Sequence, residues 1–289
     1  MKPLIVITGP TASGKTEFAI ETAHKRGCEI VNADSMQVYK YMDIGTAKPT
    51  VKERDGIPHY LFDEVEPTEN YSVASYCEAA HKYISQIHER GKVPLLVGGT
   101  GLYIDSVVYN IKYGEGGASD ELRESLGRLA DEKGNEYIYE MLKKIDPESA
   151  EKIHLSDRKR IIRAIEVYRL TGQTMSEQRR RSRQEGRVYK AEIYAIDMER
   201  EKLYNRINDR VDKMFEAGLV KEVEHLLNMG VGKDATAMQA IGYKETARFL
   251  SGEILLDEAK QLIKQGTRRY AKRQLTWFNK NSEINWVRR

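Results

Sequence analysis

Short apolar runs alternate with amphipathic stretches over the first part of the chain. The runs lie at residues 4–7, 29–33 and 94–97. After the first run, apolar side chains recur at helical spacing up to Gly27, and after the second they do so from Ser72 to Gly91. Strands that alternate with helices are typical of an α/β fold. We therefore predict a parallel sheet flanked by helices.

Residues 113–190 have a different pattern, without a run that reads as a buried strand. Apolar side chains recur three or four residues apart at 122–129, 138–145 and 161–168, which predicts an all-helical insertion. Residues 193–197 read as a core strand again, and amphipathic helices follow, the last at about 257–279. We expect a first part of the core at 1–112, the insertion at 113–190 and a second part of the core at 191–289.

Charge is distributed unevenly in this chain of 289 residues, whose formal net charge is +3. Residues 158–190 hold eleven Lys and Arg against three Glu, and residues 264–289 hold eight against one. A solvated helix face explains either segment alone. Two such segments in one chain favour a surface that binds a polyanion such as nucleic acid.

The two cysteines, Cys28 and Cys77, lie far apart and in no metal or redox spacing. The first apolar run starts almost at once, so we expect no signal peptide. No apolar run reaches the roughly 20 residues that a membrane span needs. These features predict a cytoplasmic protein that does not cross a membrane.

A phosphate-binding loop follows the first apolar run and precedes the first helix. Its pattern, Gly-x4-Gly-Lys-Thr, is that of the P-loop, in the strand–loop–helix context that the motif requires. The backbone N–H groups and the helix N-terminus favour phosphate, the Lys adds a full charge, and the Thr hydroxyl can ligate Mg2+. The residues that we expect to bind phosphate are Gly9, Pro10, Thr11, Ala12, Ser13, Gly14, Lys15 and Thr16.

Two further strand ends carry polar side chains. Asp34 follows residues 29–33, and in a parallel sheet it lies at the same edge as the P-loop. It reads as a general base or metal ligand, or else as a helix N-cap or a turn residue. The run at 94–97 ends in Gly-Gly-Thr-Gly, with Thr100 in it, where an ordinary NTPase carries an aspartate. Arg206 and Arg210 form a pair four residues apart, either a diphosphate clamp or surface arginines.

Several motifs together resemble the tRNA dimethylallyltransferase (tRNA isopentenyltransferase) family. They are GPTASGKT at 9–16, DSMQVY at 34–39, DIGTAKP at 43–49, GGTGLY at 98–103, RIIRAIEVY at 160–168, QAIGYKE at 239–245 and RRYAKRQLTWF at 268–278. The likeness covers essentially the whole chain. It is closer to the bacterial form, since no Cys/His zinc finger follows Trp277.

The resemblance implies a P-loop kinase-like core with a helical insertion and a specific reaction. A dimethylallyl group would pass from dimethylallyl diphosphate to the exocyclic amine of the adenosine 3′-adjacent to the anticodon. Asp34 would be the general base, Thr100 would orient a reactant, and Arg210 would join the P-loop in binding diphosphate, with Mg2+ on Thr16. The P-loop then holds a leaving group, which explains why the Asp of an NTPase is missing.

The resemblance also implies an interface with the tRNA anticodon stem-loop. The residues expected there are Asp34, Ser35, Met36, Gln37, Thr100, Arg123, Lys159, Arg160, Ile161, Ile162, Arg163, Gln239, Ala240, Ile241, Gly242, Tyr243 and Lys244. The arginines at 179–181 form a further basic run. We expect a monomer, because no sequence feature requires a dimer. The alternatives are a P-loop small-molecule or nucleotide kinase and a non-catalytic RNA-binding module.

Overall fold

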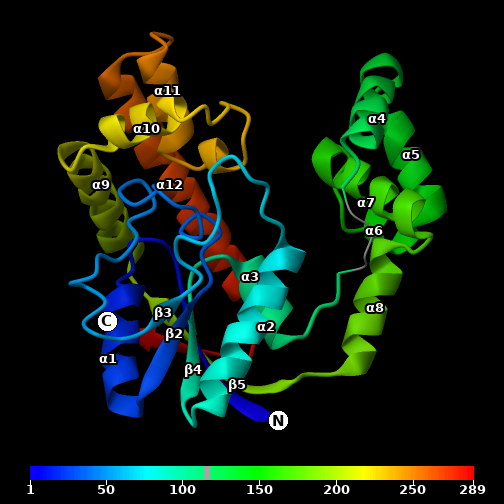
Figure 1. Cartoon of the computed structure of the whole chain (residues 1–289). Coiled ribbons are helices and arrows are strands. Elements are labelled where there is room, and N and C mark those ends of the chain that lie inside the picture. The colour runs from blue at the N-terminus through cyan, green and yellow to red at the C-terminus, as the bar shows by residue number, and fades with distance from the viewer. Residues whose placement is uncertain (114–117) are drawn as a thin grey trace. The chain divides into compact units, whose positions relative to one another are not determined.

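The computed structural model describes residues 1–113 and 118–289, which divide into two compact units (Figure 1). The core unit consists of Met1–Val108 and Val188–Arg289, and the helical unit of Tyr109–Arg187. Residues 114–117, near the start of the predicted insertion, lie outside the described part of the chain.

A parallel sheet forms the centre of the core unit, which confirms the predicted fold class. The described residues form six strands in the order β3-β2-β4-β1-β5-β6, and all neighbours pair in parallel. The strands are β1 (Lys2–Thr8), β2 (Cys28–Asn32), β3 (His59–Tyr60), β4 (Val93–Val97), β5 (Tyr189–Asp197) and β6 (Ile284–Arg288). The sequence pattern did not predict β3, which has two residues, or β6, which lies in the basic C-terminal segment.

Helices lie on both sides of this sheet, because successive strand residues point to opposite faces. Ile5 and Ile7 of β1 pack with Ala19 and Ala23 of α1, and Figure 1 shows α2 on the opposite side. The helices of the core unit are α1 (Lys15–Arg26), α2 (Val73–Glu89), α3 (Gly101–Val108), α9 (Arg200–Glu216), α10 (Leu219–Asn228), the short 3-10 helix η1 (Ala237–Gln239), α11 (Tyr243–Leu250) and α12 (Leu256–Phe278).

A second apolar cluster of the core unit joins the segment after β2 to the C-terminal helices. Met42 packs there with Val211 of α9, Leu219 of α10, Tyr243 of α11 and Ile263 of α12, all of them nearly inaccessible to solvent. The long segment between β2 and α2, which contains few regular elements, is therefore anchored on buried side chains. This anchoring fixes the backbone from which part of the site is built.

The helical unit has a hydrophobic core of its own. Leu126, Ile138, Leu142, Ile161 and Ile165 are its most buried large members. Its helices are α4 (Asp120–Lys133), α5 (Asn135–Ile145), α6 (Pro147–Ala150), α7 (Arg158–Thr171) and α8 (Met175–Glu185). Neither unit contains, in its described residues, a helix long and apolar enough to cross a membrane.

Candidate active site

Three loops meet at the carboxyl edge of the sheet, where ligands of α/β folds bind. The strand register brings them level, because Ile7 of β1 and Asn32 of β2 both lie beside Val97 of β4. The P-loop (residues 9–16) follows β1, Asp34 follows β2, and the glycine loop (residues 98–101) follows β4. Because parallel strands end at the same edge of the sheet, segments far apart in the sequence form one site here.

The P-loop adopts the tight conformation that its glycines permit. Gly9 has φ of 137° and Gly14 has φ of 91°, values that favour glycine, and α1 begins at Lys15. Ser13 is buried, and its Oγ has no hydrogen-bond partner among the described residues. The ammonium of Lys15 donates to the Pro10 carbonyl at 2.8 Å. The loop therefore combines a buried hydroxyl that lacks a partner with a cation next to the N-terminus of a helix.

Electrostatics at this edge favour an anion. Burial and, second to it, the nearby Arg210 guanidinium lower the pKa of Lys15 to about 8, and Asp34 opposes the shift. Burial also lowers the pKa of Arg210, again opposed by Asp34. Two cations held close together without full solvation gain most from a ligand that carries several negative charges.

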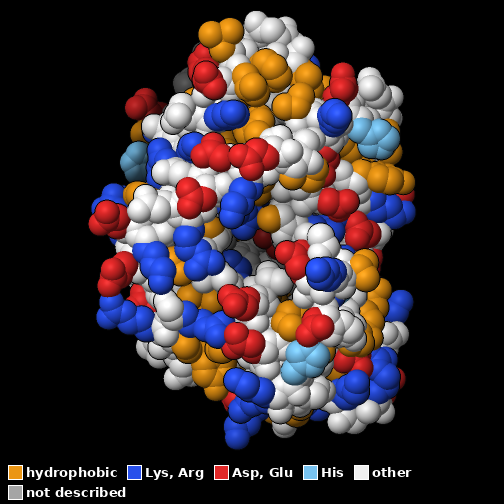
Figure 2. Space-filling view, turned by 90° about the vertical axis from the view of Figure 1, so that its left-hand side faces the viewer, with side chains coloured by type: hydrophobic (Ala, Val, Ile, Leu, Met, Phe, Trp, Pro, Cys, Tyr) orange, Lys and Arg blue, Asp and Glu red, His pale blue; other side chains and the backbone are white. Residues whose placement is uncertain are grey.

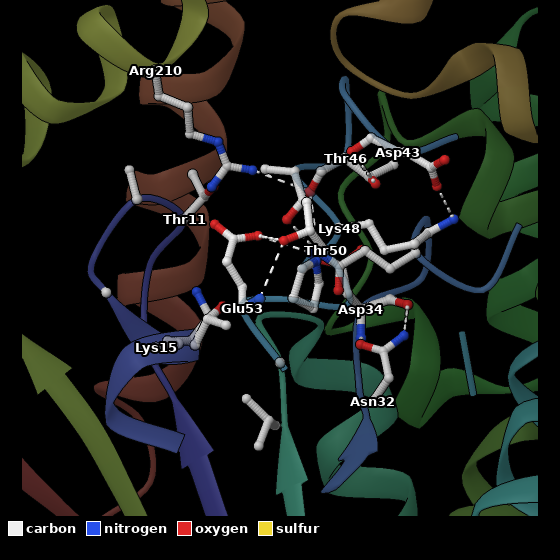
Figure 3. Close-up of a pocket in the computed structure, with 18 of the residues that line it drawn as sticks. Thr11, Lys15, Asn32, Asp34, Asp43, Thr46, Lys48, Thr50, Glu53 and Arg210 are labelled. Carbon is white, nitrogen blue, oxygen red and sulfur yellow. Dashed lines mark hydrogen bonds and ion pairs between the residues drawn. The ribbon is translucent and has the colours of Figure 1, made fainter. Parts of the chain in front are cut away.

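Asp34 is held in place by its neighbours in the chain. Its Oδ1 accepts a hydrogen bond from the N–H of Met36 at 2.9 Å, and its own N–H donates to Oδ1 of Asn32 at 3.0 Å. The Asn32 side chain also donates to the Leu61 carbonyl at 2.9 Å, which fixes its orientation. Figure 3 shows Lys15, at the start of α1, and Asp34, after β2, among the side chains that surround the cavity. Asp34 is half-buried, so a substrate can reach the carboxylate.

The glycine loop binds closely to the residues around Asp34. The N–H of Thr100 donates to the Ala33 carbonyl at 3.1 Å, and its Oγ1 accepts from the N–H of Ser35 at 3.1 Å. A Cβ atom on Gly98 would clash with the backbone of Ala33, so glycine is required for this approach. Thr100 thus holds Ser35, the residue after Asp34.

The loop at residues 43–48 forms another wall of the site. Its Thr46 carbonyl accepts from Arg210 of α9 at 3.1 Å and from the Gln37 side chain at 3.1 Å (Figure 3). The carboxylate of Glu222 on α10 accepts the backbone N–H groups of residues 43, 44 and 45. Lys48 is buried and donates to the Asp43 carboxylate and to the Tyr39 carbonyl. Sequence reasoning assigned no role to Glu222 or Lys48, although Lys48 lies in the DIGTAKP motif at 43–49.

These walls enclose a cavity of about 690 Å³. Figure 2 shows a hollow on the face that carries α1 and α9, with Lys, Arg and acidic side chains at its border. Of the residues expected to react or to bind diphosphate, seven line the cavity: Thr11, Ala12, Gly14, Lys15, Thr16, Asp34 and Arg210. Gln37, expected to contact tRNA, lines it too. Gly9, Pro10, Ser13 and Thr100 are not lining residues. The cavity thus brings together a P-loop, a guanidinium and a carboxylate.

The residues expected to contact tRNA differ widely in exposure. Ser35, Met36, Ile162 and Ile241 are half-buried, and Gln239, Lys244, Lys159 and Arg160 are exposed. Ile161, Ala240, Gly242 and Tyr243 are buried. Tyr243 lies under Gly45, where a Cβ atom would clash with its ring, and its hydroxyl donates to Glu222 at 2.6 Å. Tyr243 therefore supports the loop at residues 43–48.

Arg123 and Arg163 in the helical unit have a buried acidic partner. Glu166 accepts from Arg163 at 2.6 Å and lies 2.9 Å from Nε of Arg123, and it also accepts the N–H of Ser119. Burial by itself raises the pKa of Glu166, but these hydrogen bonds outweigh it and hold the pKa below its usual range. The two arginines therefore neutralise a buried charge, whatever else they bind.

The comparisons with known proteins agree on one family. The model of the IPP transferase family matches residues 37–281. A tRNA dimethylallyltransferase of Acetivibrio thermocellus is 54% identical over 287 residues, covering 99% of this chain and 92% of the relative. One from Carboxydothermus hydrogenoformans is 52% identical over 283 residues, with 98% and 91% covered.

Solved structures are similar over the whole chain. The tRNA isopentenylpyrophosphate transferase of Bacillus halodurans has a TM-score of 0.74 at 42% identity, with 100% of this chain and 90% of the other covered. A eukaryotic dimethylallyltransferase captured acting on tRNA has a TM-score of 0.84 at 31% identity, with 100% and 74% covered.

Proposed function

The chain belongs to the IPP transferase family and transfers a dimethylallyl group to tRNA, and we propose that the cavity at the sheet edge is where it does so. The donor is dimethylallyl diphosphate, and the acceptor is the exocyclic amine of the adenosine 3′-adjacent to the anticodon. One observation carries this proposal: Lys15, Arg210 and Asp34 line the same cavity. Such a cavity can hold a diphosphate leaving group beside a base.

The donor side of the cavity stabilises the departing diphosphate. As the allylic C–O bond breaks, the electron pair goes to the diphosphate oxygen, and negative charge grows there. Lys15 and Arg210 supply full positive charges, and the N-terminus of α1 supplies N–H donors. Ser13 does not line the cavity, but its buried hydroxyl has no partner among the described residues, so we propose it as a further donor for a phosphate oxygen. Preorganised charges of this kind act without the reorganisation that water requires.

A magnesium ion fits this donor set. Mg2+ takes one or two protein ligands and completes its shell with phosphate oxygens and water. The Thr16 hydroxyl is exposed at the start of α1 and lines the cavity, so we propose it as the protein ligand. The described residues contain no group of three or more His, Cys, Asp or Glu that could bind a metal by themselves. When bound, the ion would neutralise charge on the diphosphate.

The acceptor side uses Asp34 as the general base. The adenine amine attacks the allylic carbon, forms the new C–N bond and must lose one proton, which Asp34 accepts. Thr100 is a positioning residue, because it holds Ser35 next to Asp34. The adenine reaches the carboxylate after it leaves its stack in the RNA.

The tRNA would bind through exposed cations and polar side chains of both units, including Lys159, Arg160, Gln239 and Lys244. We propose that the helical insertion contacts the anticodon stem-loop. Because tRNA is the substrate, we expect the reaction to take place in the cytoplasm. One chain supplies every residue assigned to the cavity, so a monomer suffices.

The deciding experiment incubates the protein with dimethylallyl diphosphate, Mg2+ and unmodified tRNA, and then measures the mass of the nucleosides. We expect one adenosine in the anticodon loop to gain one dimethylallyl group. Sequencing of the modified fragment locates it next to the anticodon. Unmodified tRNA after complete incubation, or transfer of phosphate from ATP to a small molecule, would overturn the proposal.

A further inference from the structure

We propose that Gln274 is a positioning residue for prenyl transfer, which holds the P-loop and the glycine loop at a fixed separation. This inference rests on the proposed function, because it assigns the donor to one loop and the acceptor side to the other. Gln274 lies on α12, far along the chain from both loops, and is only 4% exposed.

The amide of Gln274 forms one hydrogen bond to each loop. Its Oε1 accepts the backbone N–H of Thr11 in the P-loop at 2.8 Å, and its Nε2 donates to the carbonyl of Gly99 in the glycine loop at 2.8 Å. The orientation of the amide is unambiguous, since a backbone N–H can only donate and a carbonyl can only accept. No other uncharged side chain of this length offers both a donor and an acceptor in this way.

Two neighbours of this bridge support its role. A Cβ atom on Gly99 would clash with Nε2 of Gln274, so the contact requires glycine at that position. Tyr270 lies one turn earlier on α12, and the side chains of Thr100 and Gln274 both act on its hydroxyl, whose pKa they lower against the effect of burial. One face of α12 therefore reaches two neighbouring residues of the glycine loop, Gly99 and Thr100.

The bridge affects the reaction through geometry. Gln274 lines the cavity, and its Oε1 binds the N–H of Thr11, so this N–H is not available to phosphate and Gln274 shapes the P-loop. Thr100 follows Gly99 and holds Ser35 beside Asp34. The separation between diphosphate and base thus depends on the Gln274 amide. A displacement of about 1 Å between reacting groups can slow a reaction about 100-fold.

The first test is Gln274→Leu, which keeps the approximate size of the side chain and removes both hydrogen bonds. We expect single-turnover prenylation to fall about 100-fold while the dissociation constant for dimethylallyl diphosphate rises less than about threefold. The matched control is Gln261→Leu, on the exposed side of the same helix. A rate within about threefold of wild type, or a rate loss that the loss of donor affinity explains fully, overturns the inference.

The second test is a pH profile of Gln274→Glu. An ionised carboxylate can accept from Thr11 but cannot donate to the Gly99 carbonyl, whereas a protonated carboxyl can do both. The rate of this variant relative to wild type should therefore rise as the pH falls, and that of Gln274→Leu should not. A ratio that does not change with pH overturns the role of the donor in this bridge.

A third test approaches the contact from the other side and does not depend on the Leu variant being folded. Gly99→Ala alone should slow the reaction, because the methyl group displaces the amide. Adding Gln274→Ala should cost nothing further, since the bridge is already broken. Additive losses contradict the inference. If wild type itself does not modify tRNA, the proposed function fails; if wild type and all variants react alike, only this inference fails.

Discussion

Glu222 provides the sharpest test of how the site is supported. Its carboxylate lies 3.0, 2.7 and 3.0 Å from the backbone nitrogens of Asp43, Ile44 and Gly45, and it accepts the hydroxyl of Tyr243 at 2.6 Å. An ionised acceptor makes each of these hydrogen bonds stronger than a neutral pair. The perturbation is Glu222→Ala, which removes all of them at once.

The magnitude follows from which groups lose their partner. Tyr243 is fully buried, and residues 44 and 45 are half-buried, whereas Asp43 is exposed and its N–H can bind water instead. Each buried group without a partner costs about 1–3 kcal/mol. Because water can enter at the two half-buried residues, we expect a total loss of about 3–5 kcal/mol in the free energy of unfolding. Glu222→Gln keeps one acceptor oxygen and should lose about 1–2 kcal/mol.

The assay is equilibrium urea denaturation followed by tryptophan fluorescence. The chain has two tryptophans, Trp277 and Trp286, and both belong to the core unit, so the signal reports on that unit. Glu224→Ala, at an exposed position of the same helix, is the control and should stay within about 0.5 kcal/mol of wild type. A loss below about 1 kcal/mol for Glu222→Ala would refute the reasoning.

Three further predictions concern charge. The pKa of Lys15 is about 8, and only its protonated form pairs with diphosphate. Affinity for dimethylallyl diphosphate, measured by calorimetry, should therefore fall up to about tenfold per pH unit above pH 8. An affinity that stays constant over this range contradicts the prediction. Burial raises the pKa of Asp105 to about 6, and the hydrogen bond from the Trp277 indole opposes this shift. The folded chain therefore holds a proton on Asp105 that the unfolded chain releases, and the free energy of unfolding falls as the pH rises through about 4–6. Asp105→Asn, which still accepts that hydrogen bond, should raise the free energy of unfolding by up to about 3 kcal/mol near pH 7.5 and little near pH 4, and equal effects at both pH values would count against it. Replacing the three arginines at 179–181 by Gln should weaken tRNA binding and reduce the slope of log affinity against log salt by about 2; an unchanged slope removes them from the interface.

The parts of the site that sequence patterns predicted are those defined locally. The P-loop has its glycines, Lys15 and the flanking strand and helix within one short stretch. Asp34 and Thr100 directly follow apolar runs, and the rule that parallel strands end at one edge is enough to bring them together. The position of Arg210 was undecided from its spacing alone, because a surface arginine has the same pattern.

The parts that sequence patterns missed are contacts between distant segments. Glu222 lies on the polar side of an amphipathic helix and looks like any solvated carboxylate, yet it binds a loop 177 residues away at Gly45. Gln274 stands in a strongly basic helix, which suggested only RNA contacts, and its partner Thr11 is 263 residues away. Tyr243 lies in a motif that the family resemblance connects with tRNA, although its ring is buried. Only tertiary packing determines where these side chains point.

Asp34→Asn tests the central claim most directly, because it removes the base and keeps the shape of the site. The amide oxygen can still accept the N–H of Met36, so the local turn should persist. Single-turnover prenylation of tRNA and the dissociation constant for dimethylallyl diphosphate are measured on the same preparation. The account predicts a rate that falls about 100- to 10,000-fold, with donor affinity within about threefold of wild type. Near wild-type prenylation by this variant would contradict it.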